Sequence, residues 1–205
     1  IMYAGTGEKY TAGDASGNGI YKSTDGGTNW TLIFGRGSGT VTSTGGPPPL
    51  QSEVEGMFYV NDLVLWDHDK NPGTQKLLFA ALGSGAVRGR YMRSTFLDPY
   101  TFGLYKSTDG GASFSKITSV NNGVGISKLE EINDLEVQEV SNRLWMSTNR
   151  NIWSGSFGGR FWYSDNGTAF TRATPNFPAL TGIDASSYYR TEIAPSHIDT
   201  DTHYV

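Results

Sequence analysis

The sequence GIYKSTDGGTNWTLI at residues 19–33 recurs as GLYKSTDGGASFSKI at residues 103–117. In both copies a β-prone segment and a lysine precede Ser-Thr-Asp-Gly-Gly, and an aromatic residue and a second β-prone segment follow it. In a tight turn an aspartate can accept hydrogen bonds from backbone N–H groups, and glycine can adopt positive φ. Each copy therefore predicts a β-hairpin that is closed by its Asp-Gly-Gly turn.

A weaker copy, GRFWYSDNGTAFTRA, lies at residues 159–173, and Tyr163 stands there where the serine is expected. We expect the aromatic residue of each copy to fold back over its hairpin and to be largely buried. The residues expected to shape the three turns are Ser23, Asp25, Gly27 and Trp30; Ser107, Asp109, Gly111 and Phe114; and Asp165, Gly167 and Phe170.

This Ser-x-Asp-x-Gly-x-x-aromatic pattern resembles the Asp box, which is also called the bacterial neuraminidase repeat (BNR). The resemblance implies a β-propeller, in which the box joins the third and fourth strands of a four-stranded blade on the outer rim. It also implies that the aspartate of the box is structural. The resemblance spans nearly the whole chain, and it points to sortilin-like and glycosyl hydrolase-like proteins of bacterial secreted or cell-surface origin.

The segments before the second and third boxes supply the inner half of a blade. Two strand-like segments precede each box, and the first of each pair carries a shared pattern, Val60-Asn61-Asp62-Leu63 and Ile132-Asn133-Asp134-Leu135. Helical spacing of Leu129, Ile132 and Leu135 is the alternative for the second of these segments. The repeat predicts an all-β chain of about three four-stranded blades of a larger propeller. The expected boundaries are 1–45, 56–118 and 129–174, with the start of a fourth blade at 186–205.

The two ends of the sequence have the same phase within this repeat. The first residues, IMYAGTG, match the second strands KLLFAALG and RLWMSTN, and the last residues, THYV, match the start of the same strand. We therefore expect the remaining blades to come from polypeptide outside these residues. We also expect unpaired strand edges beside residues 1–7 and 188–205.

Composition limits the classes of function. The chain has 205 residues with 27 Gly, 8 Pro, no Cys and a net charge of −4. Without cysteine, disulfides and thiolate metal sites are excluded. No apolar segment is long enough to span a bilayer, and the scattered charges lack the basic patch that nucleic acid requires. We expect a protein or glycan partner, no cofactor, and the extracellular or cell-surface location that the resemblance implies.

Three acidic residues, Asp62, Asp134 and Glu192, occupy matching places on successive inner strands and are candidates for one mouth of the propeller channel. Glycoside hydrolysis needs two carboxyl groups in unlike environments, whereas a repeat places like with like. We therefore expect these residues to be structural or channel-lining, and no residue is assigned as catalytic. A sialidase would carry an Arg-Ile-Pro motif, which this sequence lacks.

Other polar and aromatic clusters are weaker candidates. Phe96, Tyr100 and Phe102 form a possible ligand-binding loop, and packing of this loop on its own blade is the alternative. The turn WDHDKN at residues 66–71 offers oxygen atoms to calcium, but it lacks the spacing of a dedicated calcium loop. The three histidines are not spaced as metal ligands, so no metal site is predicted.

The sequence therefore favours a non-catalytic extracellular binding or scaffold module. The alternative is part of a glycoside hydrolase, sialidase-like or endo-glucanase-like, whose catalytic residues lie partly outside this chain.

Overall fold

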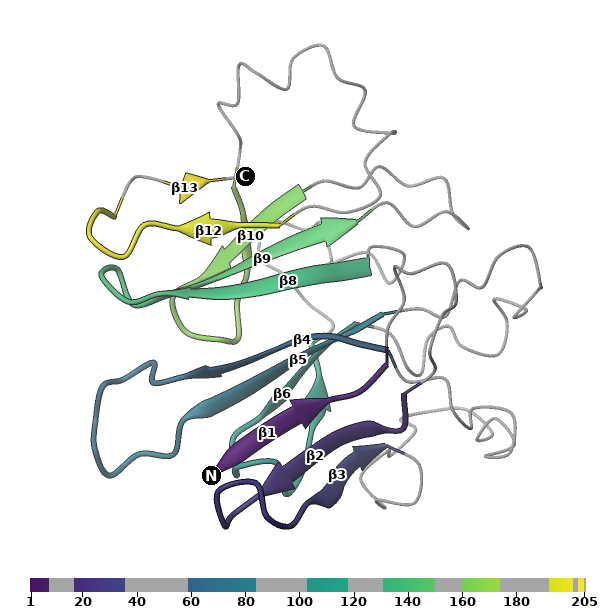
Figure 1. Cartoon of the computed structure of the whole chain (residues 1–205). Coiled ribbons are helices and arrows are strands. Elements are labelled where there is room, and N and C mark those ends of the chain that lie inside the picture. Colours follow the sequence, from purple (N-terminus) through teal and green to yellow (C-terminus); the bar gives the residue numbers. More distant parts are fainter. Residues whose placement is uncertain are drawn as a thin grey trace, which may run out of the picture.

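The chain forms a stack of antiparallel β-sheets (Figure 1). The computed structural model describes residues 1–7, 17–35, 59–83, 103–117, 131–149, 160–173, 192–200 and 203–204. All regular elements in these residues are strands, so the expected all-β class is confirmed. The strands are β1 (Met2–Gly5), β2 (Gly19–Ser23), β3 (Thr31–Gly35), β4 (Tyr59–Trp66), β5 (Leu77–Gly83), β6 (Gly103–Ser107), β7 (Ser115–Lys116), β8 (Glu131–Gln138), β9 (Arg143–Asn149), β10 (Arg160–Ser164), β11 (Thr171–Arg172), β12 (Ala194–Pro195) and β13 (His203–Tyr204).

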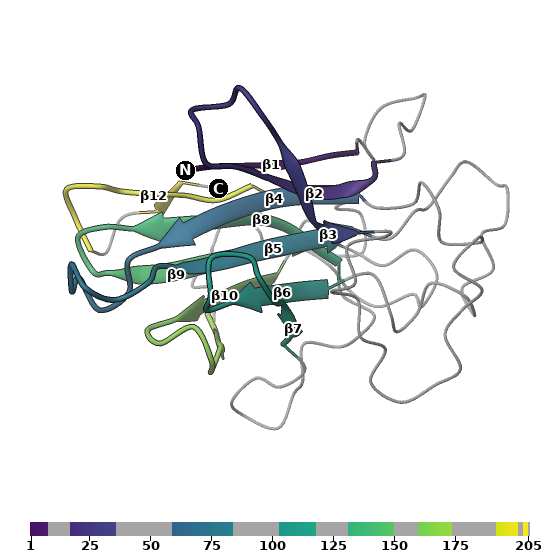
Figure 2. The same ribbon diagram turned by 90° about the horizontal axis from the view of Figure 1, so that it is seen from below.

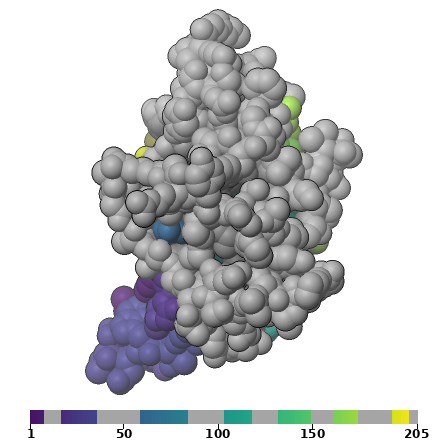
Figure 3. All heavy atoms as spheres, turned by 90° about the vertical axis from the view of Figure 1, so that its right-hand side faces the viewer, coloured from purple at the N-terminus to yellow at the C-terminus, as the bar shows by residue number. Residues whose placement is uncertain are grey.

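The strands pair in chain order. We call β1-β2-β3 the first sheet, β4-β5-β6-β7 the second sheet, β8-β9-β10-β11 the third sheet and β12-β13 the C-terminal pair. All of these pairings are antiparallel. The first sheet lies at one end of the stack, where its purple and blue atoms stand out in Figure 3, and the C-terminal pair lies at the other end (Figure 1). In the described residues no strand pairing joins these two ends.

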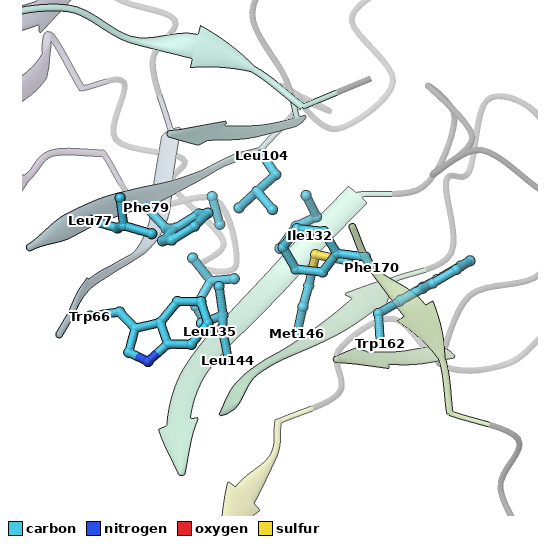
Figure 4. Packing of buried hydrophobic residues seen from close by; sticks show 11 residues of the cluster. Trp66, Leu77, Phe79, Leu104, Ile132, Leu135, Leu144, Met146, Trp162 and Phe170 are labelled. Carbon is cyan, nitrogen blue, oxygen red and sulfur yellow. The ribbon is translucent and has the colours of Figure 1, made fainter. Parts of the chain in front are cut away.

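The hydrophobic core lies between the sheets (Figure 4). Trp66 and Phe79 of the second sheet pack with Leu135 and Met146 of the third sheet and with Phe170. A second cluster joins the first and second sheets through Ile20, Phe34, Val60, Ala80, Leu82 and Tyr105. Fully burying a side chain of this size stabilises the fold by about 1.5–3 kcal/mol, so these interfaces hold neighbouring sheets together.

We call β4 and β8, the first strands of the second and third sheets, the inner strands. Each contains a register shift at the shared Asn-Asp pattern. The register of β4 against β5 shifts between Val60 and Asp62, and that of β8 against β9 shifts between Ile132 and Asp134. One extra residue bends the strand and redirects the neighbouring side chains. The strand expectation for this part of the chain is confirmed and the helical alternative is wrong, because β8 runs over Glu131–Gln138 as a strand.

Candidate functional site

The first hairpin turn is held by a serine and an aspartate. Ser23 Oγ donates to Asp25 Oδ1 at 2.8 Å and accepts the Gly27 N–H at 2.8 Å. Asn29 donates its backbone N–H to Asp25 Oδ1 at 2.9 Å and its side-chain amide to Oδ2 at 2.7 Å. These hydrogen bonds lower the pKa of Asp25 to about 2, and the bond from the Asn29 backbone N–H is the largest cause. Gly26 and Gly27 have φ of 76° and 96°, which the turn requires and most other residues avoid.

The second turn repeats this arrangement. Ser107 Oγ donates to Asp109 Oδ1 at 2.7 Å and accepts the Gly111 N–H at 2.8 Å. Ser113 donates its N–H to Asp109 Oδ1 at 2.9 Å and its hydroxyl to Oδ2 at 2.5 Å. Slight burial raises the pKa of Asp109, but the hydrogen bonds from Ser113 and Ser107 outweigh it and lower the pKa to about 2. Both carboxylates are therefore ionised and occupied within their own turns.

The third turn differs from the alignment that the sequence suggested. Ser164 Oγ accepts the Gly167 N–H at 2.9 Å, and Asn166 Oδ1 accepts the Ala169 N–H at 2.9 Å. Ser164 and Asn166 thus take the places of the serine and the aspartate, and this turn is one residue shorter. Asp165, which was expected in the turn, is exposed and pairs with Arg143 at 2.6 Å.

The three aromatic residues of the hairpins differ in burial. The expectation of burial is confirmed for Phe170, which is 0% exposed, and it is wrong for Trp30, which is 40% exposed. Phe114 is partly buried, with its ring centroid 4.7 Å from that of Phe34. Trp30 instead donates its Nε1–H to Gly27 O at 2.9 Å. Phe114 and Phe170 pack against residues of the preceding sheet, whereas Trp30 is bonded to its own turn.

Lysines on β2 and β6 bind the hairpin turn of the next sheet. Lys22 Nζ donates to Gly110 O at 2.6 Å, and Lys106 Nζ donates to Gly167 O at 3.1 Å. Tyr3 adds a hydroxyl bond to Gly110 O at 3.0 Å. The lysine of the repeated Tyr-Lys-Ser segment therefore links one sheet to the turn of its successor.

The candidate acidic residues lie where neighbouring inner strands meet. Asp62 Oδ2 accepts the Leu135 N–H at 2.8 Å, and Asp134 Oδ2 accepts the Ile193 N–H at 2.7 Å. Glu192, the third candidate, is exposed and directly precedes Ile193. The carboxylates of β4 and β8 are therefore used in the same way: Asp62 binds the backbone of β8, and Asp134 binds the backbone directly before β12.

An asparagine completes this contact on β4. Asn61 Nδ2 donates to Ile132 O at 2.7 Å, next to the bond between Asp62 and Leu135. We call the pair Asn61 and Asp62 the Asn-Asp clamp. It offers one donor and one acceptor to the backbone of β8, so it fixes both the position and the direction of the neighbouring strand.

Burial raises the pKa of Asp62 to about 6, although the N–H groups of Leu135 and Leu63 lower it. The negative charges of Asp134 and Glu136 raise it further. Burial, followed by the charge of Asp134, also raises the pKa of Glu136. A carboxyl group of this kind can carry a proton in mildly acidic solution, a property that is shared by acid catalysts and by structural networks.

Sequence reasoning missed the residues that end the inner strands. Trp66 donates its Nε1–H to Asn142 Oδ1 at 3.0 Å, and Gln138 donates its side-chain amide to Asp199 O at 3.0 Å. Both bonds reach the turn that follows the next inner strand. Their shared position at the ends of β4 and β8 was the available signal, but a tryptophan and a glutamine look unrelated in sequence.

Other predicted candidates do not form a described site. Phe96, Tyr100 and Phe102 lie outside the described residues. In the turn after β4, Asp67 pairs with Lys76 at 3.4 Å, and Asp69 accepts the Asn71 N–H at 3.0 Å. The described residues contain no group of three or more His, Asp or Glu side chains that could hold a metal ion. Nor do they contain a helix of the length and hydropathy needed to cross a membrane.

The chain is similar to known proteins at the level of solved structures. No family model matches the sequence. A search of curated proteins also finds no match. Among solved structures, the chain is similar to a GH74 enzyme from Niastella koreensis, with a TM-score of 0.51 and 17% sequence identity. The match covers 92% of this chain and 22% of that chain, so this chain spans about a fifth of the solved protein. At this identity the likeness concerns the fold.

Proposed function

We propose that the sheets are blades of a β-propeller with Asp-box turns, and that the chain serves as a non-catalytic extracellular or cell-surface module that binds a protein or a glycan. The observation that carries this proposal is the use of the repeated carboxylates. Asp62 accepts a backbone N–H of β8, and Asp134 accepts the N–H of Ile193, directly before β12. They are therefore parts of the scaffold rather than groups directed at a substrate.

Carboxylate geometry supports the scaffold role over catalysis. Hydrolysis of a glycosidic bond needs one carboxyl group to protonate the leaving oxygen and a second one on the other side of the sugar. Asp62 uses Oδ1 for the Leu63 N–H at 2.7 Å and Oδ2 for the Leu135 N–H at 2.8 Å. A carboxyl group whose two oxygens both accept backbone N–H groups is held in place by the scaffold, which supports a structural role.

The hairpin turns support the structural part of the proposal in the same way. Asp25 and Asp109 are ionised and bind residues four positions further along their own turns. An aspartate that is satisfied locally stabilises a turn and contributes no group to a ligand.

The second candidate function is glycoside hydrolysis. It is favoured by the raised pKa of Asp62, which would suit a general acid, and by the fold similarity to a GH74 enzyme, a glycosyl hydrolase. In that case Asp62 would act with a carboxylate from outside the described residues.

One experiment separates the two functions. The chain and its Asp62→Asn variant would be tested for binding to soluble β-glucans by affinity electrophoresis and for release of reducing ends. We expect retention of at least one polysaccharide, no release of reducing ends, and a lower unfolding midpoint for Asp62→Asn with binding unchanged. Release of reducing ends that the substitution abolishes in a folded protein would establish the hydrolase instead. If no polysaccharide is retained, the glycan part of the proposal is wrong and a protein ligand remains.

A further inference from the structure

The third hairpin turn carries a neutral side chain where the other two turns carry a carboxylate. Asn166 takes the place that Asp25 and Asp109 have in the first and second turns. Its Oδ1 accepts the backbone N–H groups of Thr168 and Ala169, each at 2.9 Å. Figure 2 shows this turn as the light green loop next to β10. The third turn therefore holds an amide by its oxygen, as the other turns hold their carboxylates.

The residue after Asn166 is a glycine, and this dipeptide is chemically reactive. The backbone nitrogen that follows an asparagine can attack the side-chain Cγ atom, and glycine obstructs this approach least because it has no Cβ atom. Asn166 is exposed to water, whereas Gly167 is buried. The chain thus places a reactive amide at a position where the corresponding acid is already used in two other turns.

The contacts of Oδ1 favour the attack. When the Gly167 nitrogen approaches Cγ, negative charge develops on Asn166 Oδ1, which already accepts two backbone N–H groups. Hydrogen bonds to a charged oxygen are about twice as strong as those to a neutral one, so these donors stabilise the transition state more than the starting amide. The opposing contact is the bond from the Gly167 N–H to Ser164 Oγ at 2.9 Å, which must break before the nitrogen reacts.

The preceding sheet selects the product. Attack and loss of ammonia give a cyclic imide, which water can open on either side of the ring nitrogen. One opening restores the normal backbone with an aspartate, and the other leaves isoaspartate, which adds a carbon atom to the backbone before Gly167. A Cβ atom on Gly167 would lie 2.8 Å from Phe79 Cζ and 3.0 Å from Leu77 Cδ1, so the glycine has little room to move. The folded chain therefore favours aspartate.

A carboxylate suits this position. Hydrogen bonds within the turn lower the pKa of Asp25 to about 2, and for Asp109 such bonds outweigh slight burial and lower the pKa to the same value. Asp165, which precedes Asn166, is paired with Arg143 at 2.6 Å, so the new charge does not lie beside an unpaired carboxylate. The turn would hold the charged product by the N–H groups that now hold the amide.

We propose that Asn166 is a self-modification site, at which the third turn converts from the asparagine form to the aspartate form of the other two turns. The Gly167 nitrogen bonds to Cγ and gives up its proton, the bond between Cγ and Nδ2 breaks, and Nδ2 leaves as ammonia with that proton. Water then adds to Cγ, the bond from Cγ to the Gly167 nitrogen breaks, and this nitrogen regains a proton. The net reaction consumes water and releases ammonia.

The Asn18-Gly19 dipeptide is a matched control within the same chain. Asn18 is also exposed and Gly19 is also buried, and the Gly19 N–H also donates to a hydroxyl oxygen, Thr6 Oγ1, at 3.0 Å. Asn18 is held by the other end of its amide, because its Nδ2 donates to the Tyr21 hydroxyl at 3.1 Å. The two sites therefore share the dipeptide and the bonded glycine N–H, and they differ in which amide atom the protein binds.

The chain would be aged at neutral pH, folded or in urea, and then digested with trypsin, which releases residues 161–172 and 10–22 as separate peptides. Mass spectrometry measures the conversion of amide to acid, synthetic standards separate aspartate from isoaspartate, and an unaged sample corrects for conversion during digestion. In the folded chain we expect Asn166 to convert at least about tenfold faster than Asn18, with aspartate as the main product. In urea the two sites should convert at similar rates.

The product form is tested with Asn166→Asp, and Asn18→Asp is its control. We expect a higher unfolding midpoint at neutral pH for Asn166→Asp than for the original chain, and no gain for Asn18→Asp. Three results would overturn the proposal. They are equal conversion of the two sites in the folded chain, including none at either, isoaspartate as the main folded-state product at Asn166, and a lower unfolding midpoint for Asn166→Asp.

Discussion

The turns at residues 23–30 and 107–114 share the sequence Ser-Thr-Asp-Gly-Gly and the same internal hydrogen bonds, yet their surroundings differ. A Cβ atom on Gly111 would lie 2.4 Å from Ile33 Cδ1 of the first sheet. A Cβ atom on Gly27 would have Met2 Sδ as its nearest neighbour, at 3.5 Å. The second turn is covered by the sheet before it, and the first turn is open among the described residues.

The hydrogen bonds of these turns and the burial of these turns have different causes. The hydrogen bonds of the turn depend on residues within it, so they form in both places. Burial of the turn depends on the preceding sheet, which contributes Lys22 and Tyr3 to the second turn. The same turn sequence therefore contributes more to the free energy of unfolding where another sheet packs on it.

The largest effect is expected from a glycine in a covered turn. Gly167 has a φ of 66°, and a Cβ atom there would lie 2.8 Å from Phe79 Cζ and 3.0 Å from Leu77 Cδ1. Backbone strain of about 1–2 kcal/mol and overpacking of about 1–3 kcal/mol add for Gly167→Ala. For Gly27→Ala only the strain applies. Denaturant unfolding of the two variants should differ by about 2 kcal/mol, and equal losses would show that the preceding sheet does not cover the third turn.

The second prediction compares a carboxyl group between sheets with one in an open turn. Burial raises the pKa of Asp62 to about 6, whereas hydrogen bonds lower that of Asp25 to about 2. A raised pKa stabilises the folded chain while the group is protonated, below its unfolded pKa of about 3.9, and this stability is lost as pH rises through about 6. Between about pH 4 and pH 7 this group should reduce the free energy of unfolding by about 2–3 kcal/mol.

The measurement is denaturant unfolding across this pH range. Asp62→Asn should remove this part of the pH dependence, whatever its effect on total stability. Asp25→Asn is the control, and its contribution has the opposite sign, because a lowered pKa gives stability that is lost as pH falls towards about 2. The same slope in the original chain and in Asp62→Asn would show that another group titrates here.

The all-β class, the hairpins and the strand order within the second and third sheets could be predicted from the repeated sequence. The shift in the third turn could not, because the Asp-x-Gly spacing is compatible with two alignments and only the hydrogen bonds of Ser164 and Asn166 distinguish them. The sequence showed that Asp62 and Asp134 are equivalent. It could not show what they bind, because every residue except proline has a backbone N–H and the residue types do not indicate which one is bound.

The third prediction tests the alignment of the turns. Asp109→Ala leaves the backbone N–H of Ser113 and the hydroxyl of Ser107 without their acceptor. The loss should be about 1–2 kcal/mol, because water can reach the exposed Ser113 N–H but not the buried Ser107 hydroxyl. Asp165→Ala removes only an exposed ion pair with Arg143 and should cost at most about 0.5 kcal/mol. A larger loss for Asp165→Ala than for Asp109→Ala in thermal unfolding would restore the original alignment.

The smallest effect is expected at Trp30, where the open turn is most directly probed. Trp30→Phe keeps an aromatic ring but removes the Nε1–H that donates to Gly27 O. Because the residue is 40% exposed, water can replace that donor, and the loss should stay at or below about 0.5 kcal/mol. Phe170→Leu, at a residue that is 0% exposed, is the comparison and should cost more, since it changes a filled core position. A loss above about 1.5 kcal/mol for Trp30→Phe that grows with protein concentration would mean that another molecule covers this turn in solution. The turns at residues 23–30 and 107–114 would then both be covered in solution.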